Sequence, residues 1–232
     1  MKDLAVIETI LRNRYHFFGE IREGIGLQEK MRAMLISSVA FLALYGAVMG
    51  STHSLWQALS SAVKLPLLFL ATLIVCSPTL YFFNVLFGSN QSLTQNVSLI
   101  LTAITVTAVL LLSFAPITLF FLLTTSHYQF FKLLNVGVSA IAGSMGVTFL
   151  GQGMRVVSAA GKNKDEGDRA RRWVLRLWVL IYAFVGSQMA WTLRPFIGAP
   201  AMKFELFRQL GGNFYANVFA SIGEILGFVM VR

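Results

Sequence analysis

From residue 30 to residue 164 the chain has no aspartate or glutamate, a stretch of 135 residues in a protein of 232. Between residues 33 and 154, the charged side chains are Lys64 and Lys132 alone. A soluble domain carries about a quarter charged residues, whereas this chain carries 12%. A membrane-spanning helix needs about 20 apolar residues. The sequence therefore predicts an all-α, polytopic transmembrane helical bundle, and excludes a soluble enzyme, a disordered linker and a disulfide scaffold.

Apolar runs divide the chain into about five candidate spans. They cover residues 33–50, 66–87, 93–123, 133–150 and 173–193. The third run is longer than one crossing requires and contains Pro116, which favours a tilted, kinked or extended helix. We expect an amphipathic cytoplasmic segment at 1–30, a membrane domain at 31–195 and a separate C-terminal segment at 196–232.

The 19 Lys and Arg residues are unevenly distributed over the flanks of these spans. With five spans, 13 fall on the side of the N-terminus and 6 on the other. Cytoplasmic loops carry an excess of Lys and Arg. We therefore expect a cytoplasmic N-terminus and a cytoplasmic loop at 152–172. The Lys and Arg residues lie at the ends of apolar runs. We therefore expect the net charge of +9 to orient the protein in the membrane and to contact anionic lipid at the inner surface, and we expect no nucleic acid partner.

Both terminal segments have apolar residues at helical spacing. Near the N-terminus the stripe consists of Leu4, Ile7, Leu11, Tyr15, Phe18 and Ile25. It predicts an amphipathic helix that lies either on the inner membrane surface or against the membrane domain. Near the C-terminus the stripe consists of Val218, Phe219, Ile222, Leu226 and Val229, with Asn217, Ser221 and Glu224 turned away from it. This helix is either interfacial or a sixth span, and a span would place Glu224 in the bilayer at a cost of about 2.5 kcal/mol or more.

Residues that support catalysis are scarce in this chain. The three histidines, His16, His53 and His127, are far apart in the sequence. His16 has Glu20 four residues later but no second histidine, so a zinc-peptidase motif is absent. Gly151-Gln152-Gly153 resembles only half of a dinucleotide-binding fingerprint. We expect no enzyme, and no catalytic, cofactor-binding or metal site.

Three groups of residues remain as candidate functional positions. Neutral amides within the spans can join helices or line a polar path: Asn84, Asn96, Asn135 and Gln188. Embedded prolines can bend a helix and serve as hinges or gates: Pro78 and Pro116. Basic residues of the loop after the fourth span form a candidate docking site for a cytoplasmic protein: Lys162, Lys164, Arg169, Arg171 and Arg172.

Small residues four positions apart recur in the spans. Such pairs let two helix backbones approach closely. They are Gly46 with Gly50, Ser139 with Gly143, Ala142 with Gly146, and Gly186 with Ala190. The spacing alone does not distinguish packing within one chain from association of several copies.

Several stretches of the chain resemble known groups of membrane proteins. The five spans, the N-terminal segment and YFFNVLFGSNQSLTQ at 81–95 coarsely resemble the Yip family of GTPase-interacting membrane proteins. HYQFFKLLNV at 127–136 and SQMAWTLRPFIGAP at 187–200 are similar to an uncharacterised bacterial, chiefly cyanobacterial, group of polytopic membrane proteins. The Yip resemblance implies an interaction role without catalysis.

The sequence leaves two functions open. The first is a non-enzymatic, self-associating membrane protein, a homo-oligomer that acts as a membrane-organising or partner-docking scaffold. The alternative is a channel or facilitator for ions or small solutes, lined by neutral polar residues and gated near Pro78 and Pro116.

Overall fold

The computed structural model describes residues 2–51, 54–86, 91–125, 127–158, 166–198, 204–207 and 212–226. These residues form eight helices and no strand, which confirms the predicted all-α bundle. The helices are α1 (Lys2–Arg12), α2 (Arg14–Glu23), α3 (Leu27–Gly50), α4 (Leu55–Leu86), α5 (Leu93–Thr124), α6 (Tyr128–Ser158), α7 (Glu166–Thr192) and α8 (Phe214–Ile225).

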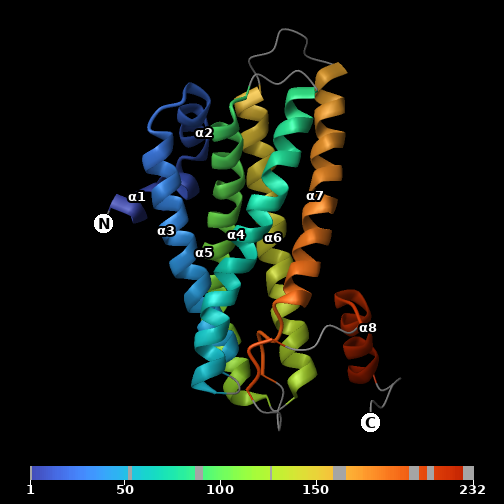
Figure 1. Ribbon diagram of the computed structural model, residues 1–232. Coiled ribbons are helices and arrows are strands. Elements are labelled where there is room, and N and C mark those ends of the chain that lie inside the picture. Colours follow the sequence, from blue (N-terminus) through green and yellow to red (C-terminus); the bar gives the residue numbers. More distant parts are fainter. Residues whose placement is uncertain are drawn as a thin grey trace.

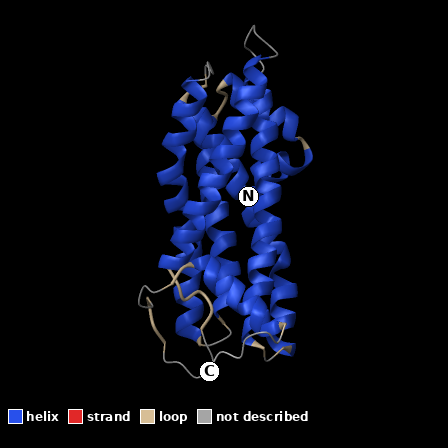
Figure 2. Ribbon diagram, turned by 90° about the vertical axis from the view of Figure 1, so that its right-hand side faces the viewer, coloured by secondary structure: helices blue, strands red, loops and turns tan. Residues whose placement is uncertain are grey.

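Helices α3 to α7 form a bundle in which each helix runs antiparallel to the next (Figure 1). The side view in Figure 2 shows the same elongated bundle. At one end, which we call the α2 end, lie α1 and α2, the last turn of α6 and the first turn of α7. The opposite end, the α8 end, holds the last turns of α3 and α5, the first turns of α4 and α6, and α8. The N-terminal helices and α8 therefore lie at opposite ends of the bundle.

Four of the described helices are long and apolar enough to cross a membrane, as expected of a membrane protein: α3, α4, α5 and residues 128–157 of α6. α5 has 32 residues, or about 48 Å at 1.5 Å per residue, which exceeds a hydrocarbon core of about 30 Å. The predicted fifth span, 173–193, falls largely within α7, which packs along α4. A total of five spans stays a prediction.

The centre of the bundle is occupied by α5. From Ser98 to Ala108 every residue of this helix except Ala103 is buried. α3 packs on one side of α5 and α6 on the other, while α4 packs mainly on α3, and α7 packs on α4. A helix surrounded by others needs apolar residues on all faces, and this explains why the longest apolar run in the sequence forms the middle of the bundle.

The glycine pairs divide into two kinds. A Cβ atom on Gly46 would lie 2.4 Å from the Ser61 carbonyl oxygen, and one on Gly50 would lie 2.5 Å from that of Gln57. These two glycines therefore bring the backbones of α3 and α4 together within one chain. Gly146 does the same between α6 and α5, whereas a Cβ on Gly143 would have no neighbour within 4 Å.

The N-terminal segment differs from the single helix that its apolar stripe predicted. A break at Asn13 separates α1 from α2, and the break shifts the helical phase between the two. Leu11, Tyr15 and Ile25 of the predicted stripe are exposed, and the buried side chains are those of Ile7, Ile10, Phe17, Phe18 and Ile21. Both helices fold against the bundle, α1 on α3 and α2 on α6.

Candidate functional site

Two of the predicted amides meet near the α2 end of the bundle. Asn84, in the last turn of α4, donates from Nδ2 to Oδ1 of Asn96 in the first turn of α5, at 3.1 Å. Asn96 in turn donates from its own Nδ2 to the backbone carbonyl of Ser77, at 3.3 Å. Both asparagines are buried, at 4% and 0% exposure. The pair thus joins α4 to α5 where the two helices follow each other in the chain.

The hinge candidate Pro78 lies next to this pair. Its position is exposed on the outer surface of α4. Side chains from two other helices bind the backbone just before it: Asn96 binds the Ser77 carbonyl, and Trp178 of α7 donates from Nε1 to the Cys76 carbonyl at 3.0 Å. Trp178 is 2% exposed. The two carbonyls that precede Pro78 thus accept hydrogen bonds from side chains of α5 and α7, which hold this part of α4 from two sides.

The other hinge candidate, Pro116, lies on an exposed position of α5 in the half of the bundle nearer the α8 end. Two residues later Thr118 is fully buried. Among the described contacts, the nearest interhelical hydrogen bond joins Tyr45 of α3 to Asn135 of α6. The Tyr45 hydroxyl donates to Asn135 Oδ1 at 2.8 Å, and Asn135 Nδ2 donates to the Phe131 carbonyl of its own helix at 2.8 Å.

The predicted amides lie at widely separated levels of the bundle. Gly146 of α6 lies opposite Thr107 of α5, so along these antiparallel helices Asn135 is level with Thr118. Asn96 and Asn135 are therefore separated by about 33 Å along α5, at 1.5 Å per residue. Gln188 is half-buried on α7. Between the two asparagine sites the interior holds fully buried apolar side chains, among them Leu42, Leu99, Ile100 and Leu111, together with buried hydroxyl side chains: Ser38, Ser98, Thr102 and Thr105.

The predicted docking residues lie at the α2 end or outside the described part of the chain. Lys162 and Lys164 are outside the described residues. Arg169, Arg171 and Arg172 lie in the first turns of α7, where the structure describes the backbone and not the side chains. The start of α7 lies at the same end as α1 and α2 (Figure 1).

Packing against the membrane domain was one of the two arrangements that the N-terminal stripe left open, but the contact of α2 with Gly153 of α6 is a feature that the sequence analysis missed. The Phe18 ring is fully buried, and a Cβ atom on Gly153 of α6 would lie 2.7 Å from Phe18 Cε1. Gly153 is thus the place where the Phe18 ring packs against the α6 backbone, which explains this glycine without a nucleotide. The sequence signal was available, because a glycine near the end of a span often marks a close approach.

Polar groups complete the docking of α2. Gln95 of α5 donates from Nε2 to the backbone carbonyls of Ile21 and Arg22, at 3.1 and 2.9 Å. These carbonyls belong to the last turn of α2, where a helix leaves its acceptors unsatisfied. The same Gln95 forms a capping box with Ser92 at the start of α5. Glu20 of α2 also forms an ion pair with Lys30 of α3 at 3.0 Å.

A second missed feature lies at the α8 end, on one face of α4. Gln57, Ser61 and Lys64 form what we call the α4 polar ladder. Gln57 donates to the Pro195 carbonyl at 2.8 Å, Ser61 donates to the Phe196 carbonyl, and Lys64 donates to the carbonyls of Pro195 and Leu206. The ladder holds the chain after α7 against α4. Spacing of four and then three residues places these side chains on one helical face, and this pattern could have been found in the sequence.

Lys64 is only 3% exposed, although the sequence analysis treated it as an ordinary flanking charge. Its Nζ lies 4.8 Å from the centre of the Phe207 ring. Backbone carbonyls and an aromatic face therefore surround this cation, which suits a lysine that is buried near one end of a membrane helix.

No group of three or more His, Cys, Asp or Glu side chains that could hold a metal ion lies among the described residues. Comparison of the chain with protein-family models, with curated proteins and with solved structures gives no match.

Proposed function

We propose that this protein is a non-enzymatic membrane scaffold that docks other components at the α2 end of its bundle. The observation that carries the proposal is the packing of α1 and α2 into the bundle at the end where α6 finishes and α7 begins. The basic residues of the N-terminal helices therefore belong to the same end of the molecule as Arg155 near the end of α6 and the backbone of the first turns of α7.

Exposed arginines from several helices support a docking surface at this end. They are Arg12, Arg22, Arg32 and Arg155, from α1, α2, α3 and α6 respectively. Because α2 is fixed by Phe18 and Gln95, these charges are mounted on a folded surface and not on a free tail. We assign this end to the cytoplasm of a bacterial inner or thylakoid membrane, where Lys and Arg accumulate and anionic lipid lies.

Self-association is part of the proposal. Ser139 and Gly143 of α6 are left outside the packed interfaces of the chain, and a Cβ on Gly143 would meet nothing within 4 Å. A pair of small residues on an outer helix face permits close contact with a second helix. The resemblance to the Yip family, whose members act through binding partners, points to the same class of role.

The test replaces the five basic loop residues by glutamine: Lys162, Lys164, Arg169, Arg171 and Arg172. We expect proteins that crosslink to the wild type in native membranes to be lost from this variant, while its thermal unfolding in detergent is unchanged. A matched control replaces Lys203 and Arg208, which follow α7 in the sequence, and should keep the partners. Unchanged crosslinking by the loop variant would contradict the docking proposal.

The channel alternative is tested with the same purified protein. The scaffold proposal predicts that liposomes containing the protein pass ions and small solutes no faster than empty liposomes. A flux that Asn96→Leu abolishes and Ser144→Leu, at an exposed position of α6, preserves would instead favour a polar path through the bundle.

A further inference from the structure

Helix α8 contacts α6 through polar side chains, of which Ser221 is buried while Asn217 and Glu224 stay exposed. Asn217 accepts a hydrogen bond from Lys132 Nζ of α6 at 2.9 Å, and Glu224 Oε2 accepts one from Gln129 Nε2 at 2.8 Å. Ser221, between them on the same face, is 2% exposed. These residues are spaced by four and three positions, so they form one stripe, which turns toward α6.

The opposite side of α8 is apolar and exposed. Tyr215, Phe219, Ile222 and Leu226 recur at helical spacing, with exposures of 42%, 72%, 38% and 62%. In a helix that faces water, the apolar stripe packs inward and the polar stripe is solvated. On α8, Phe214 and Val218 are half-buried. Tyr215 contacts α7, where its hydroxyl and that of Ser187 share a hydrogen bond at 3.0 Å, whereas Phe219 and Leu226 are mostly exposed and no described part of the chain covers them.

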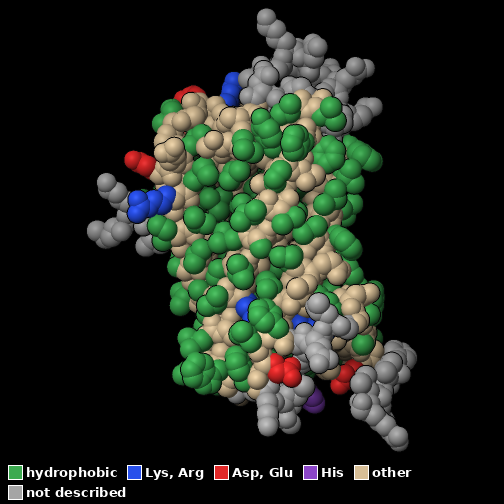
Figure 3. Space-filling view, viewed as in Figure 1, with side chains coloured by type: hydrophobic (Ala, Val, Ile, Leu, Met, Phe, Trp, Pro, Cys, Tyr) green, Lys and Arg blue, Asp and Glu red, His purple; other side chains and the backbone are tan. Residues whose placement is uncertain are grey.

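This apolar stripe continues the outer surface of the neighbouring spans. α8 packs against α6 and α7. The exposed apolar side chains of these two helices include Phe130 on α6 and Phe184 on α7. Figure 3 shows hydrophobic side chains over the full height of the bundle face. In a membrane, lipid acyl chains cover the outer surface of the spans. The apolar stripe of α8 extends that surface sideways.

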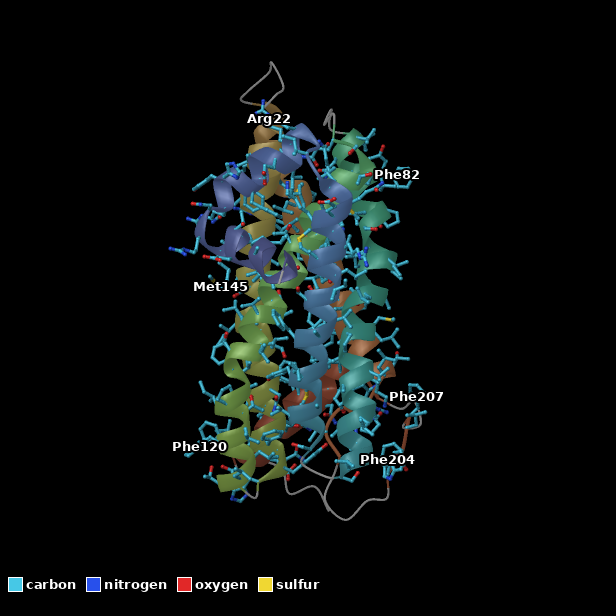
Figure 4. The ribbon with its side chains drawn as sticks, turned by 90° about the vertical axis from the view of Figure 1, so that its left-hand side faces the viewer. Arg22, Phe82, Phe120, Met145, Phe204 and Phe207 are labelled. Carbon is cyan, nitrogen blue, oxygen red and sulfur yellow. The ribbon has the colours of Figure 1, made fainter. Side chains whose placement is uncertain are left out.

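Further apolar side chains are exposed around the same end. Phe204 and Phe207, in the chain that the α4 polar ladder holds, are 41% and 57% exposed and project away from the bundle (Figure 4). Within residues 204–207, the Leu206 carbonyl thus accepts a hydrogen bond from Lys64 of α4 while the rings of Phe204 and Phe207 are exposed.

The helix is too short to cross the membrane in its described form. Its 12 residues extend about 18 Å, against a hydrocarbon core of about 30 Å. Asn213 caps its first turn by accepting a hydrogen bond from the Ala216 amide at 2.7 Å. The start of α8 is therefore defined, and over the described residues the helix is shorter than a membrane span.

We infer that α8 is a lipid-binding element that inserts Phe219, Ile222 and Leu226 into the acyl chains of the leaflet at the α8 end, while Asn217, Ser221 and Glu224 face α6. The partner is the lipid bilayer and not a second copy of the chain. This role concerns the end of the molecule opposite to the proposed docking surface and does not depend on it.

The test measures the surroundings of single spin labels in vesicles of phosphatidylcholine and phosphatidylglycerol. Labels are placed by Phe219→Cys and Ile222→Cys in a Cys76→Ala background, because Cys76 is the only native cysteine. Collision rates with oxygen, which concentrates among acyl chains, and with a water-soluble nickel chelate report the environment. Phe184→Cys on α7 is the lipid-facing control, and Glu23→Cys on α2 is the water-facing control.

We expect the oxygen-to-nickel ratio at positions 219 and 222 to match the Phe184→Cys control and to exceed the Glu23→Cys control several-fold. A ratio equal to that of Glu23→Cys would overturn the inference in favour of a water-facing helix. Exclusion of both reagents together with dipolar coupling between labels at 219 would overturn it in favour of a second copy. If Cys76→Ala impairs folding, the same labels are introduced in the wild-type background, where Cys76 is 2% exposed and protected from labelling.

Discussion

The two terminal regions of this protein use the same kind of sequence in opposite ways. Helix α2 turns Phe17, Phe18 and Ile21 into the bundle, where they are at most 1% exposed. Helix α8 binds the bundle through Asn217 and Glu224 and leaves its apolar stripe outside. An apolar stripe therefore indicates that one face of a helix avoids water, but it does not indicate whether protein or lipid covers that face.

The largest effect should come from truncation of the buried ring of α2. We expect Phe18→Ala to lower the free energy of unfolding by about 3–5 kcal/mol, because the ring is fully buried and a cavity remains. Unfolding in mixed micelles, followed by circular dichroism, measures the change. A loss below about 1 kcal/mol would mean that α2 is not docked as described.

A smaller loss is expected where the backbone of α6 makes room for that ring. Gly153→Ala should destabilise the fold by about 1–3 kcal/mol, because the added Cβ would lie 2.7 Å from buried atoms of both Phe18 and Leu99. Gly137→Ala, at an exposed position of the same helix, is the matched control. With nothing within 4 Å of its Cβ, it should be neutral or stabilise by up to about 1 kcal/mol. Equal losses in the two variants would contradict the close approach.

The polar contact of α2 should contribute less than its aromatic contact. Gln95→Ala removes the hydrogen bonds to the carbonyls of Ile21 and Arg22 and half of a capping box. We expect a loss of about 1–2 kcal/mol, together with faster amide hydrogen exchange in α2. Gln28→Ala, at an exposed position of α3, is the control and should change neither quantity.

The smallest effect sharpens the comparison between the two regions. Phe219→Ala on α8 should change the free energy of unfolding in detergent by less than about 0.5 kcal/mol, since the side chain is 72% exposed. A phenylalanine-to-alanine substitution is thus expected to have a large effect on stability in α2 and a small effect in α8. A loss approaching that of Phe18→Ala would show that Phe219 packs against protein, and would contradict the lipid-facing arrangement.

The glycine pairs and the amides show what a local sequence pattern can predict and what it cannot. Gly46–Gly50 and Ser139–Gly143 share one spacing, yet the first pair joins α3 to α4 and the second faces outward. Asn84 and Asn96, separated by 12 positions, bind each other, while Asn135 pairs with Tyr45 at the far end of the bundle. Spacing identifies residues that are able to pair, but the register between helices decides which ones do.

The missed features have the same origin. Phe18 meets Gly153, and Lys64 meets the carbonyls of Pro195 and Leu206, across more than 130 positions of the chain in each pair. No periodicity links such distant residues. The polar ladder on α4 was visible as a stripe, but its partners are backbone groups, which every residue carries.

The sequence by itself determined that the chain is helical and apolar enough for a membrane, because composition and helical periodicity are local properties and the long stretch without carboxylates leaves few alternatives. The tertiary structure alone decided the break at Asn13, the glycines that bring backbones together, the separation of the amides and the outward apolar face of α8. Each of these depends on which helix lies opposite which, and that choice is set by packing over the whole chain.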